Sequence, residues 1–359
     1  MNNGVRRFGV VFASVGVLGL TACGGGGSGD ADGSTGGGDA GGDGESVMIK
    51  FADSFPPGHV ITVTGTEFFM ERATELSEGE IEFEHYPAEQ LAAAPDLLDA
   101  AKGGISDMSY VGVAYVSDLP LSDVGTLPGS FQDSVAGTEA YWALVKEDLL
   151  DVEYLSQGVR PMYATLLPPY NLGTKEKVTK VEDLRGMAMR SSGGTMSRTI
   201  TALGGTPVQM PAPEINQAMQ RGTVEVWVGP PSSMPPYDLQ DIISYGTTNL
   251  NLGSFSGVFV INEDFYQGLS EEHRDILNQA GEETVTNLAE GVLAENERVI
   301  KDFQEQGIDM YELPAEEVAR WNELTAPVWD QWAEEMNGRG LDGDGVVENW
   351  RNRLAEAGQ

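Results

Sequence analysis

The chain has 359 residues, with 56 acidic and 21 basic side chains, and its formal net charge is −35. Such an anionic surface repels nucleic acid and anionic lipid headgroups, so we expect neither as a partner. Apolar residues make up 40% of the chain, and the length allows one large core or two ordinary ones.

The N-terminus has the pattern of an export signal. Two arginines, Arg6-Arg7, precede the apolar run 8–20, which is too short to span a bilayer, and a small-residue box leads to Cys23. We predict that residues 1–22 are a lipoprotein signal peptide and that Cys23 is lipidated. Cys23 is the only cysteine, so no disulfide or thiolate metal site is expected; the alternative for a lone cysteine is a buried apolar residue. Lipidation implies an extracytoplasmic protein anchored to a membrane face.

Residues 23–46 contain mostly Gly, Ser, Asp, Ala and Thr. Such a segment cannot form a core, so we expect a flexible tether with a reach of about 25–30 Å.

Beyond the tether, strand and helix patterns alternate. We predict strands over 47–52, 81–86 and 107–113, with helices over 59–76 and 88–101 between them. This order implies a parallel sheet with helices on its faces. A helix over 139–150 and a strand over 154–167 follow, and a second α/β unit is expected from 168 to about 252.

The last third begins with a predicted strand over 255–261. The run 270–306 has apolar residues near helical spacing and predicts one helix, more than 50 Å long if unbroken. The tail, 314–354, is predicted to be amphipathic helix, with its four tryptophans in packing contacts.

Arg190 is the leading candidate for a binding residue. It ends a predicted strand, 187–190, that follows the turn Asp183-Leu184-Arg185-Gly186. Ligands of open α/β sheets lie beyond the carboxyl ends of the strands, and a guanidinium there can bind a carboxylate through two parallel hydrogen bonds. The alternative is a surface arginine paired with an acid. Arg185, by contrast, is expected to point outward.

A second strand, 224–228, contains Trp227 and breaks at Gly229-Pro230-Pro231. Between the two strands lie Gly204-Gly205-Thr206-Pro207 and a short predicted helix, 214–220. This succession resembles the DctP-like extracytoplasmic solute-binding subunits of TRAP transporters, whose motifs are D-L-[KR]-G-x-[KR]-x-R, G-x-x-P, E-x-x-x-A-[LM]-Q-x-G and V-[DE]-x. The resemblance covers roughly residues 47–355.

The resemblance implies a two-lobed α/β fold like that of periplasmic binding proteins, with a mostly parallel sheet in each lobe and a long helix spanning both. We expect lobe I to comprise 47–167 plus 255–295, with strand 255–261 returning to the first sheet. Lobe II is then 168–254 plus 296–359. The expected partners are a small organic acid and the TRAP permease subunits in the membrane, and we expect a monomer.

Many members of the family that bind a second carboxylate or a sugar acid have another arginine where this chain has Tyr170. Its absence argues against a C4-dicarboxylate. Tyr170 and Asn171 are candidates to bind a hydroxyl or keto oxygen, or else are loop residues facing solvent. Trp227 aligns with an E-W-V-G-P segment of the family's keto-acid branch, and Val226 replaces the glutamate that helps hold a cation there. We therefore predict no metal, and expect Trp227 to form a flat wall against the ligand or to be plain core.

The remaining candidates flank other strand ends. Ser54 and His59 follow the first strand, beside Asp53, and His59 could instead be a helix-terminal residue without a ligand. Tyr110 lies in the third strand, and Asn251 and Phe255 flank the returning strand. The missing second arginine and the presence of Trp227, Tyr170 and Phe255 favour a monocarboxylate with an apolar or aromatic body, or a 2-oxo acid.

The sequence gives little support to a catalytic function. The three histidines have no metal-ligand spacing, and Gly253-Ser254-Phe255-Ser256-Gly257 has phenylalanine where a nucleophile elbow needs serine. We expect no cofactor and no enzymatic activity. The alternatives that stay open are the binding lipoprotein of an ATP-driven importer, an extracellular lipoprotein enzyme and a ligand-sensing partner of a receptor.

Overall fold

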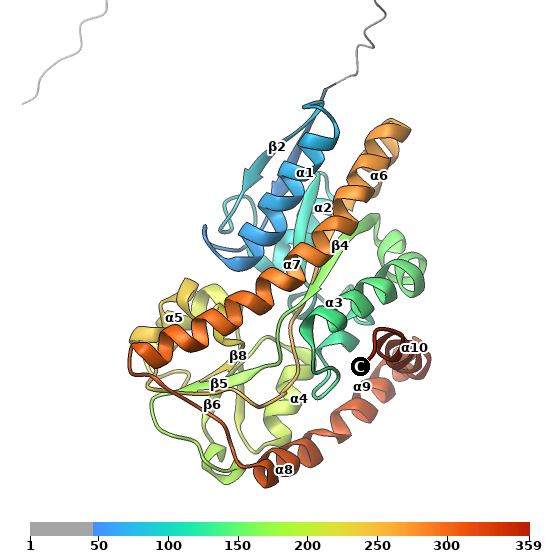
Figure 1. Ribbon diagram of the computed structural model, residues 1–359. Coiled ribbons are helices and arrows are strands. Elements are labelled where there is room, and N and C mark those ends of the chain that lie inside the picture. The colour runs from blue at the N-terminus through green and yellow to red at the C-terminus, as the bar shows by residue number, and fades with distance from the viewer. Residues whose placement is uncertain (1–45) are drawn as a thin grey trace, which may run out of the picture. The chain divides into compact units, whose positions relative to one another are not determined.

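A computed structural model describes residues 46–359 and shows two β-sheets, each the centre of a lobe (Figure 1). The predicted signal peptide, Cys23 and nearly all of the predicted tether lie outside the described residues. No helix within 46–359 is long and apolar enough to cross a membrane.

The sheet of the first lobe has five strands in mostly parallel arrangement. Strands β1, β2 and β3 are parallel to one another, and β10 runs antiparallel between β3 and β4. The predicted return of the chain to this sheet is confirmed. Its spatial order is β2 (Ile81–Tyr86), β1 (Val47–Ala52), β3 (Met108–Gly112), β10 (Ser256–Asn262) and β4 (Val159–Leu166).

The sheet of the second lobe has six strands, of which only β5 opposes the others. Strands β6, β7 and β8 are mutually parallel, and β5 pairs antiparallel with β8 and β9. Each lobe therefore has a mostly parallel sheet with one reversed strand, as predicted. The order is β11 (Asp309–Tyr311), β9 (Tyr245–Thr247), β5 (Asn171–Thr174), β8 (Val226–Gly229), β6 (Ala188–Ser191) and β7 (Thr206–Gln209).

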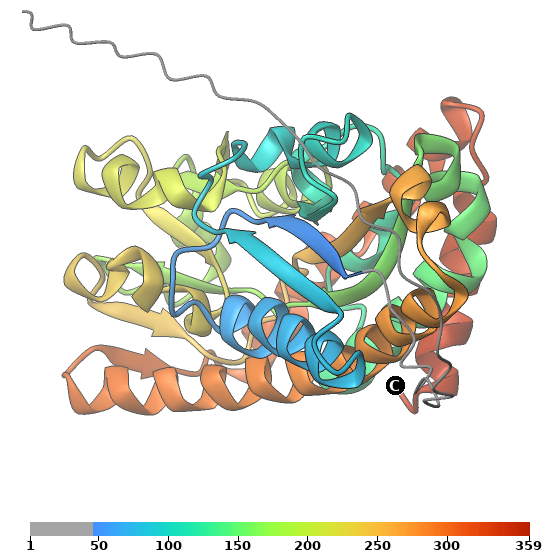
Figure 2. The same cartoon turned by 90° about the horizontal axis from the view of Figure 1, so that it is seen from above.

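Helix α7 (Glu271–Glu305) spans both lobes, and the predicted long helix is confirmed. Its 35 residues extend over about 50 Å. It packs on β4 and on helices of the first lobe and then reaches β11 of the second lobe (Figures 1 and 2). Gly281 is required at the crossing with β4, because a Cβ there would lie 2.3 Å from the carbonyl oxygen of Met162.

Shorter helices cover the remaining faces of the sheets. The predicted helix over 59–76 is a π-helical turn, Thr62–Glu67, continued by α1. The short α-helices before α7 are α1 (Phe68–Leu76), α2 (Leu97–Lys102), α3 (Ser134–Ala143), α4 (Gly194–Ala202), α5 (Ile215–Gln220) and α6 (Glu263–Gly268).

The predicted helix over 88–101 is wrong in its first half. Ala88 and Glu89 have positive φ angles of 53° and 60°. Their backbone N–H groups donate to the carbonyl oxygens of Phe55 and Asp53, 2.9 and 3.1 Å away. Pairing with the loop after β1 takes the place of helical hydrogen bonds, so only 97–102 forms α-helix.

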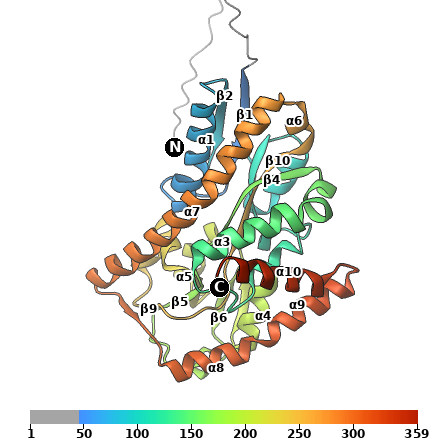
Figure 3. The same ribbon diagram turned by 45° about the vertical axis from the view of Figure 1, so that its right-hand side comes forward.

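The tail forms three helices with contacts in different parts of the molecule. Helices α8 (Ala315–Thr325) and α9 (Pro327–Gly338) contact α4 of the second lobe, and α10 (Gly343–Glu356) packs on both α9 and α3 (Figure 3). Trp350 meets Tyr141 of α3 edge-on at 6.1 Å, and the Arg353 guanidinium donates to Asp148. A buried aromatic contact and an ion pair therefore join the C-terminal helix to the segment 134–148.

Two extended segments, 167–170 and 252–255, connect the lobes side by side. The backbone N–H of Leu167 donates to Phe255 at 3.0 Å, and that of Tyr170 donates to Gly253 at 2.8 Å. Paired crossings of this kind allow the lobes to rotate about a hinge.

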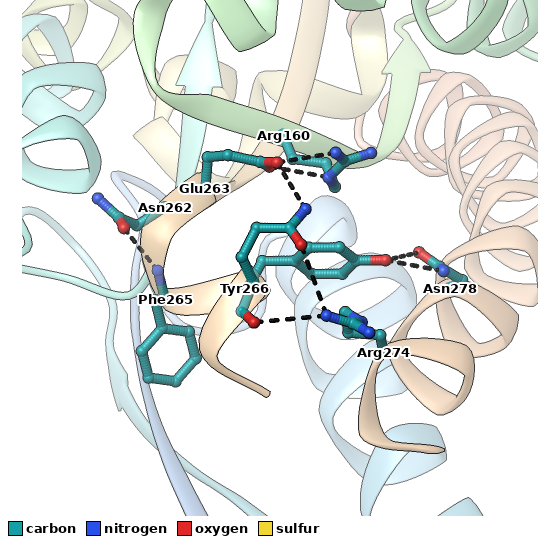
Figure 4. A network of polar contacts seen from close by, with 8 residues as sticks. Arg160, Asn262, Glu263, Phe265, Tyr266, Arg274 and Asn278 are labelled. Carbon is teal, nitrogen blue, oxygen red and sulfur yellow. Dashed lines mark hydrogen bonds and ion pairs between the residues drawn. The ribbon is translucent and has the colours of Figure 1, made fainter. Parts of the chain in front are cut away.

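The outer end of the first lobe is held by a polar network (Figure 4). Arg160 of β4 donates two hydrogen bonds to Glu263 at the start of α6, at 2.8 and 2.9 Å. The hydroxyl of Tyr266 pairs with the amide of Asn278 on α7. These contacts join β4, α6 and α7 within one lobe.

Candidate functional site

A small cavity of about 30 Å³ lies between the lobes. Seven of the nine predicted ligand-binding residues line it: Ser54, His59, Tyr110, Tyr170, Arg190, Trp227 and Phe255. Its other aromatic lining residues, Phe55, Tyr115 and Tyr237, were not predicted. Residues far apart in sequence meet here because strand ends of both sheets face the same gap.

Arg190 lies in β6, and its side chain is 1% exposed. Its Nη2 donates to the hydroxyl of Tyr115 at 2.9 Å, and its guanidinium lies 5.4 Å from the Trp227 ring centre. The Nε–H has no hydrogen-bond partner within residues 46–359. A buried charged donor without a partner is costly, so this group is available to an anionic ligand.

The pKa of Arg190 lies above its ordinary value: burial lowers it, and the surrounding tyrosines raise it by more. The guanidinium is thus a cation at neutral pH. Burial raises the pKa values of Tyr170 and Tyr237 well above their ordinary range. Both tyrosines therefore remain neutral hydroxyls beside the cation.

Tyr115 joins the two lobes at the cavity. It ends a short 3₁₀ turn, Val113–Tyr115, directly after β3 of the first lobe. Its hydroxyl oxygen accepts from Arg190 and, at 3.2 Å, from the backbone N–H of Ala212, both in the second lobe. Tyr115 was not predicted as a site residue. Its position just past the carboxyl end of a central strand is the sequence feature that could have identified it.

A second connection between the lobes lies beside the cavity. Asp123, in a 3₁₀ turn of the first lobe, accepts a hydrogen bond from the Thr195 hydroxyl in the first turn of α4. Burial raises the pKa of this carboxyl. These contacts hold the lobes in a closed arrangement.

Neutral and aromatic side chains form the wall on the first lobe. Asp53 shapes this wall from behind: its carboxylate accepts from the Phe55 N–H at 3.0 Å and pairs with His85 at 2.8 Å. Phe55 stacks on His59 at 4.4 Å and contacts Tyr110 at 4.5 Å. The carboxylate of Asp53 therefore stabilises the wall through these hydrogen bonds.

The second-lobe wall is built by Trp227, 2% exposed in β8, together with Tyr237. Phe255 lies on the connecting segment and packs against Tyr115 at 5.0 Å. Arg190 is the only charged side chain among the described residues that line the cavity. One cation in an aromatic enclosure suits a ligand with one anionic end and a flat apolar body.

Two predicted site residues lie elsewhere. The Asn171 amide accepts from the Leu250 N–H and the Thr247 hydroxyl and donates to the Pro169 carbonyl, so it is engaged within the second lobe. Asn251 binds the backbone at Gly129 and Phe131 in a separate surface groove. Both amides are therefore used in backbone connections and do not line the cavity.

Comparisons with known proteins identify the family of this chain. The family model of bacterial extracellular solute-binding proteins, family 7 (DctP), matches residues 51–335. The C4-dicarboxylate-binding periplasmic protein DctP of Rhodobacter capsulatus is 28% identical over 81% of this chain and 88% of its own length.

Solved structures show the same fold. A TRAP solute-binding protein of Rhodoferax ferrireducens with copurified benzoate is 25% identical, with a TM-score of 0.82, over 87% of this chain and 99% of that one. A TRAP periplasmic solute-binding protein of Bordetella bronchiseptica with bound mandelate is 21% identical, with a TM-score of 0.79, over 86% and 99%. The chain therefore belongs to the DctP family of extracellular solute-binding proteins and has the two-lobed fold of TRAP transporter receptors.

Proposed function

We propose that this receptor captures a small organic monocarboxylate with an aromatic or apolar body between its lobes, and delivers it to a TRAP membrane permease. The observation that supports this most is the buried Arg190, which lines an aromatic cavity and whose Nε–H has no partner among the described residues 46–359. The ligand carboxylate would accept two hydrogen bonds from the guanidinium in a water-poor site.

The proposed ligand class follows from the number of charged side chains that line the cavity. The Rhodobacter capsulatus relative is named for C4-dicarboxylates, but Arg190 alone is charged among the described lining residues here. A second carboxylate would be desolvated without a countercharge, which is costly. The benzoate of the Rhodoferax ferrireducens structure has a single charge and a flat body, which would match one cation among aromatic side chains.

Closure of the lobes provides the signal to the permease. A ligand shifts the population toward the closed form only by as much as it prefers that form. Arg190 and Trp227 come from the second lobe, and Tyr115 and His59 from the first. A ligand that contacts both walls therefore favours closure.

Calorimetry with a panel of acids tests the proposal: benzoate, mandelate, phenylpyruvate and succinate. Arg190→Met should weaken binding of the best acid by roughly 30-fold or more, because truncating one partner of a buried charge pair costs about 2–5 kcal/mol. Arg185→Met is the matched control, since Arg185 is exposed five residues earlier, and it should leave the dissociation constant unchanged. Tightest binding of succinate, or an unaltered affinity in Arg190→Met, would refute the proposal.

We also propose that residues 1–22 direct export and that lipidated Cys23 holds the receptor at the outer face of a membrane. The small-residue box before the only cysteine supports this. Fractionation of cells that express Cys23→Ala is the test.

A further inference from the structure

The proposed binding of a ligand carboxylate by Arg190 leaves two buried polar side chains on the first-lobe wall without a role. Tyr110, in β3, is 1% exposed, and its hydroxyl has no hydrogen-bond partner within residues 46–359. His59 is likewise 1% exposed. Both residues line the cavity that contains Arg190.

The hydrogen bonding of His59 determines its role. Its Nδ1 accepts a hydrogen bond from the backbone N–H of Ile61 at 3.1 Å, so the ring proton is on Nε2. Full burial lowers the pKa of His59 to about 3, so the ring is neutral at physiological pH. His59 therefore offers a neutral N–H donor.

Packing holds both groups in place. Phe55 contacts the rings of His59 and Tyr110 at centroid distances of 4.4 and 4.5 Å. Tyr110 lies directly over β10, where a Cβ at Gly257 would come within 2.5 Å of its ring. Neither ring can turn away to another partner without disturbing this packing.

A buried hydroxyl without a partner costs free energy, and a ligand that supplies the partner recovers it. The His59 Nε2–H can only donate, and the Tyr110 hydroxyl can donate or accept. A ligand hydroxyl satisfies both, because it can accept from His59 and donate to Tyr110. A second carboxylate would meet only neutral groups here.

We propose that the natural ligand is a hydroxylated aromatic monocarboxylate. Arg190 would bind its carboxylate, the aromatic walls its ring, and Tyr110 and His59 its phenolic hydroxyl. This inference rests on the proposed function and assigns to Tyr110 and His59 the selection of a hydroxylated ring over a bare one.

The experiment compares pairs of ligands that differ by one hydroxyl. Calorimetry would measure benzoate against 3- and 4-hydroxybenzoate, phenylacetate against 4-hydroxyphenylacetate, and isophthalate as a dicarboxylate. The proteins are wild type, Tyr110→Phe, Arg190→Met and Tyr266→Phe. The last is the matched control, because its hydroxyl bonds to Asn278 and neither residue lines the cavity.

Wild type should bind the best hydroxylated acid at least about 10-fold more tightly than its unsubstituted partner, as expected for a buried group otherwise left unpaired. Tyr110→Phe should reduce this ratio to within about threefold, because the hydroxylated acid loses its partner and the unsubstituted acid no longer leaves a buried hydroxyl unpaired. Tyr266→Phe should keep the wild-type ratio.

Equal wild-type affinity for every pair would overturn the inference, as would an undiminished ratio in Tyr110→Phe or tightest binding of isophthalate. The wild-type comparison stands even if a variant fails to fold. If the inference alone fails, monocarboxylates still bind and still require Arg190. If the proposed function fails, no monocarboxylate binds, or binding is indifferent to Arg190→Met.

Discussion

The hydroxyl of Tyr115 provides a direct test of how closure is coupled to binding. Tyr115→Phe removes the acceptor that the Arg190 Nη2–H and the Ala212 N–H share across the lobes. In an open form both donors would reach water. The cost of the substitution should therefore fall on the closing step.

The magnitude follows from the two donors. A buried donor that loses its partner costs about 1–3 kcal/mol, and more when it is charged. The Arg190 donor can bind the ligand carboxylate instead, so the lasting loss is that of the neutral Ala212 N–H. We expect the dissociation constant to rise by about 5- to 150-fold.

Calorimetry with the tightest-binding acid of the panel measures this rise, and small-angle X-ray scattering of the saturated variant should show a more open average shape. Tyr266→Phe removes a hydroxyl whose hydrogen bond lies within the first lobe and should leave the dissociation constant unchanged. An affinity of Tyr115→Phe within twofold of wild type would refute the coupling.

Two further predictions concern stability and location. Burial raises the pKa of Glu153 to about 7, so the folded state retains a proton that the unfolded chain releases near pH 4.5. The stabilisation is present below that pH and is lost as the pH rises to about 7, about 3 kcal/mol in all. In urea unfolding at pH 4.5 and 8, Glu153→Gln should lose less stability than wild type across that interval; an equal loss would contradict the assignment. Cys23→Ala should release the receptor from the membrane fraction into the soluble extracytoplasmic fraction, and retention of the variant in the membrane fraction would exclude lipidation as the anchor.

Sequence patterns predicted the elements whose period and flanking turns were unambiguous. The long helix and the returning strand β10 were placed within two residues. Arg190, which lines the cavity, could be selected as a candidate because a strand end beside a Gly-Ser turn is recognisable without knowledge of the partner strands. The first half of the predicted helix 88–101 is not helical, because its backbone bonds to residues more than 30 positions away. A local sequence pattern contains no information about such contacts.

What the sequence alone indicated is thus local: the pattern of an export signal, which stays a prediction, alternating strands and helices, and an arginine at a strand end. The tertiary structure decided which side chains share the cavity. It placed Tyr115, Tyr237 and Phe55 around the same space as Arg190 and turned Asn171 and Asn251 toward backbone partners. The physical reason is that the site forms only where two lobes close, and the distances across that gap depend on the packing of the whole chain.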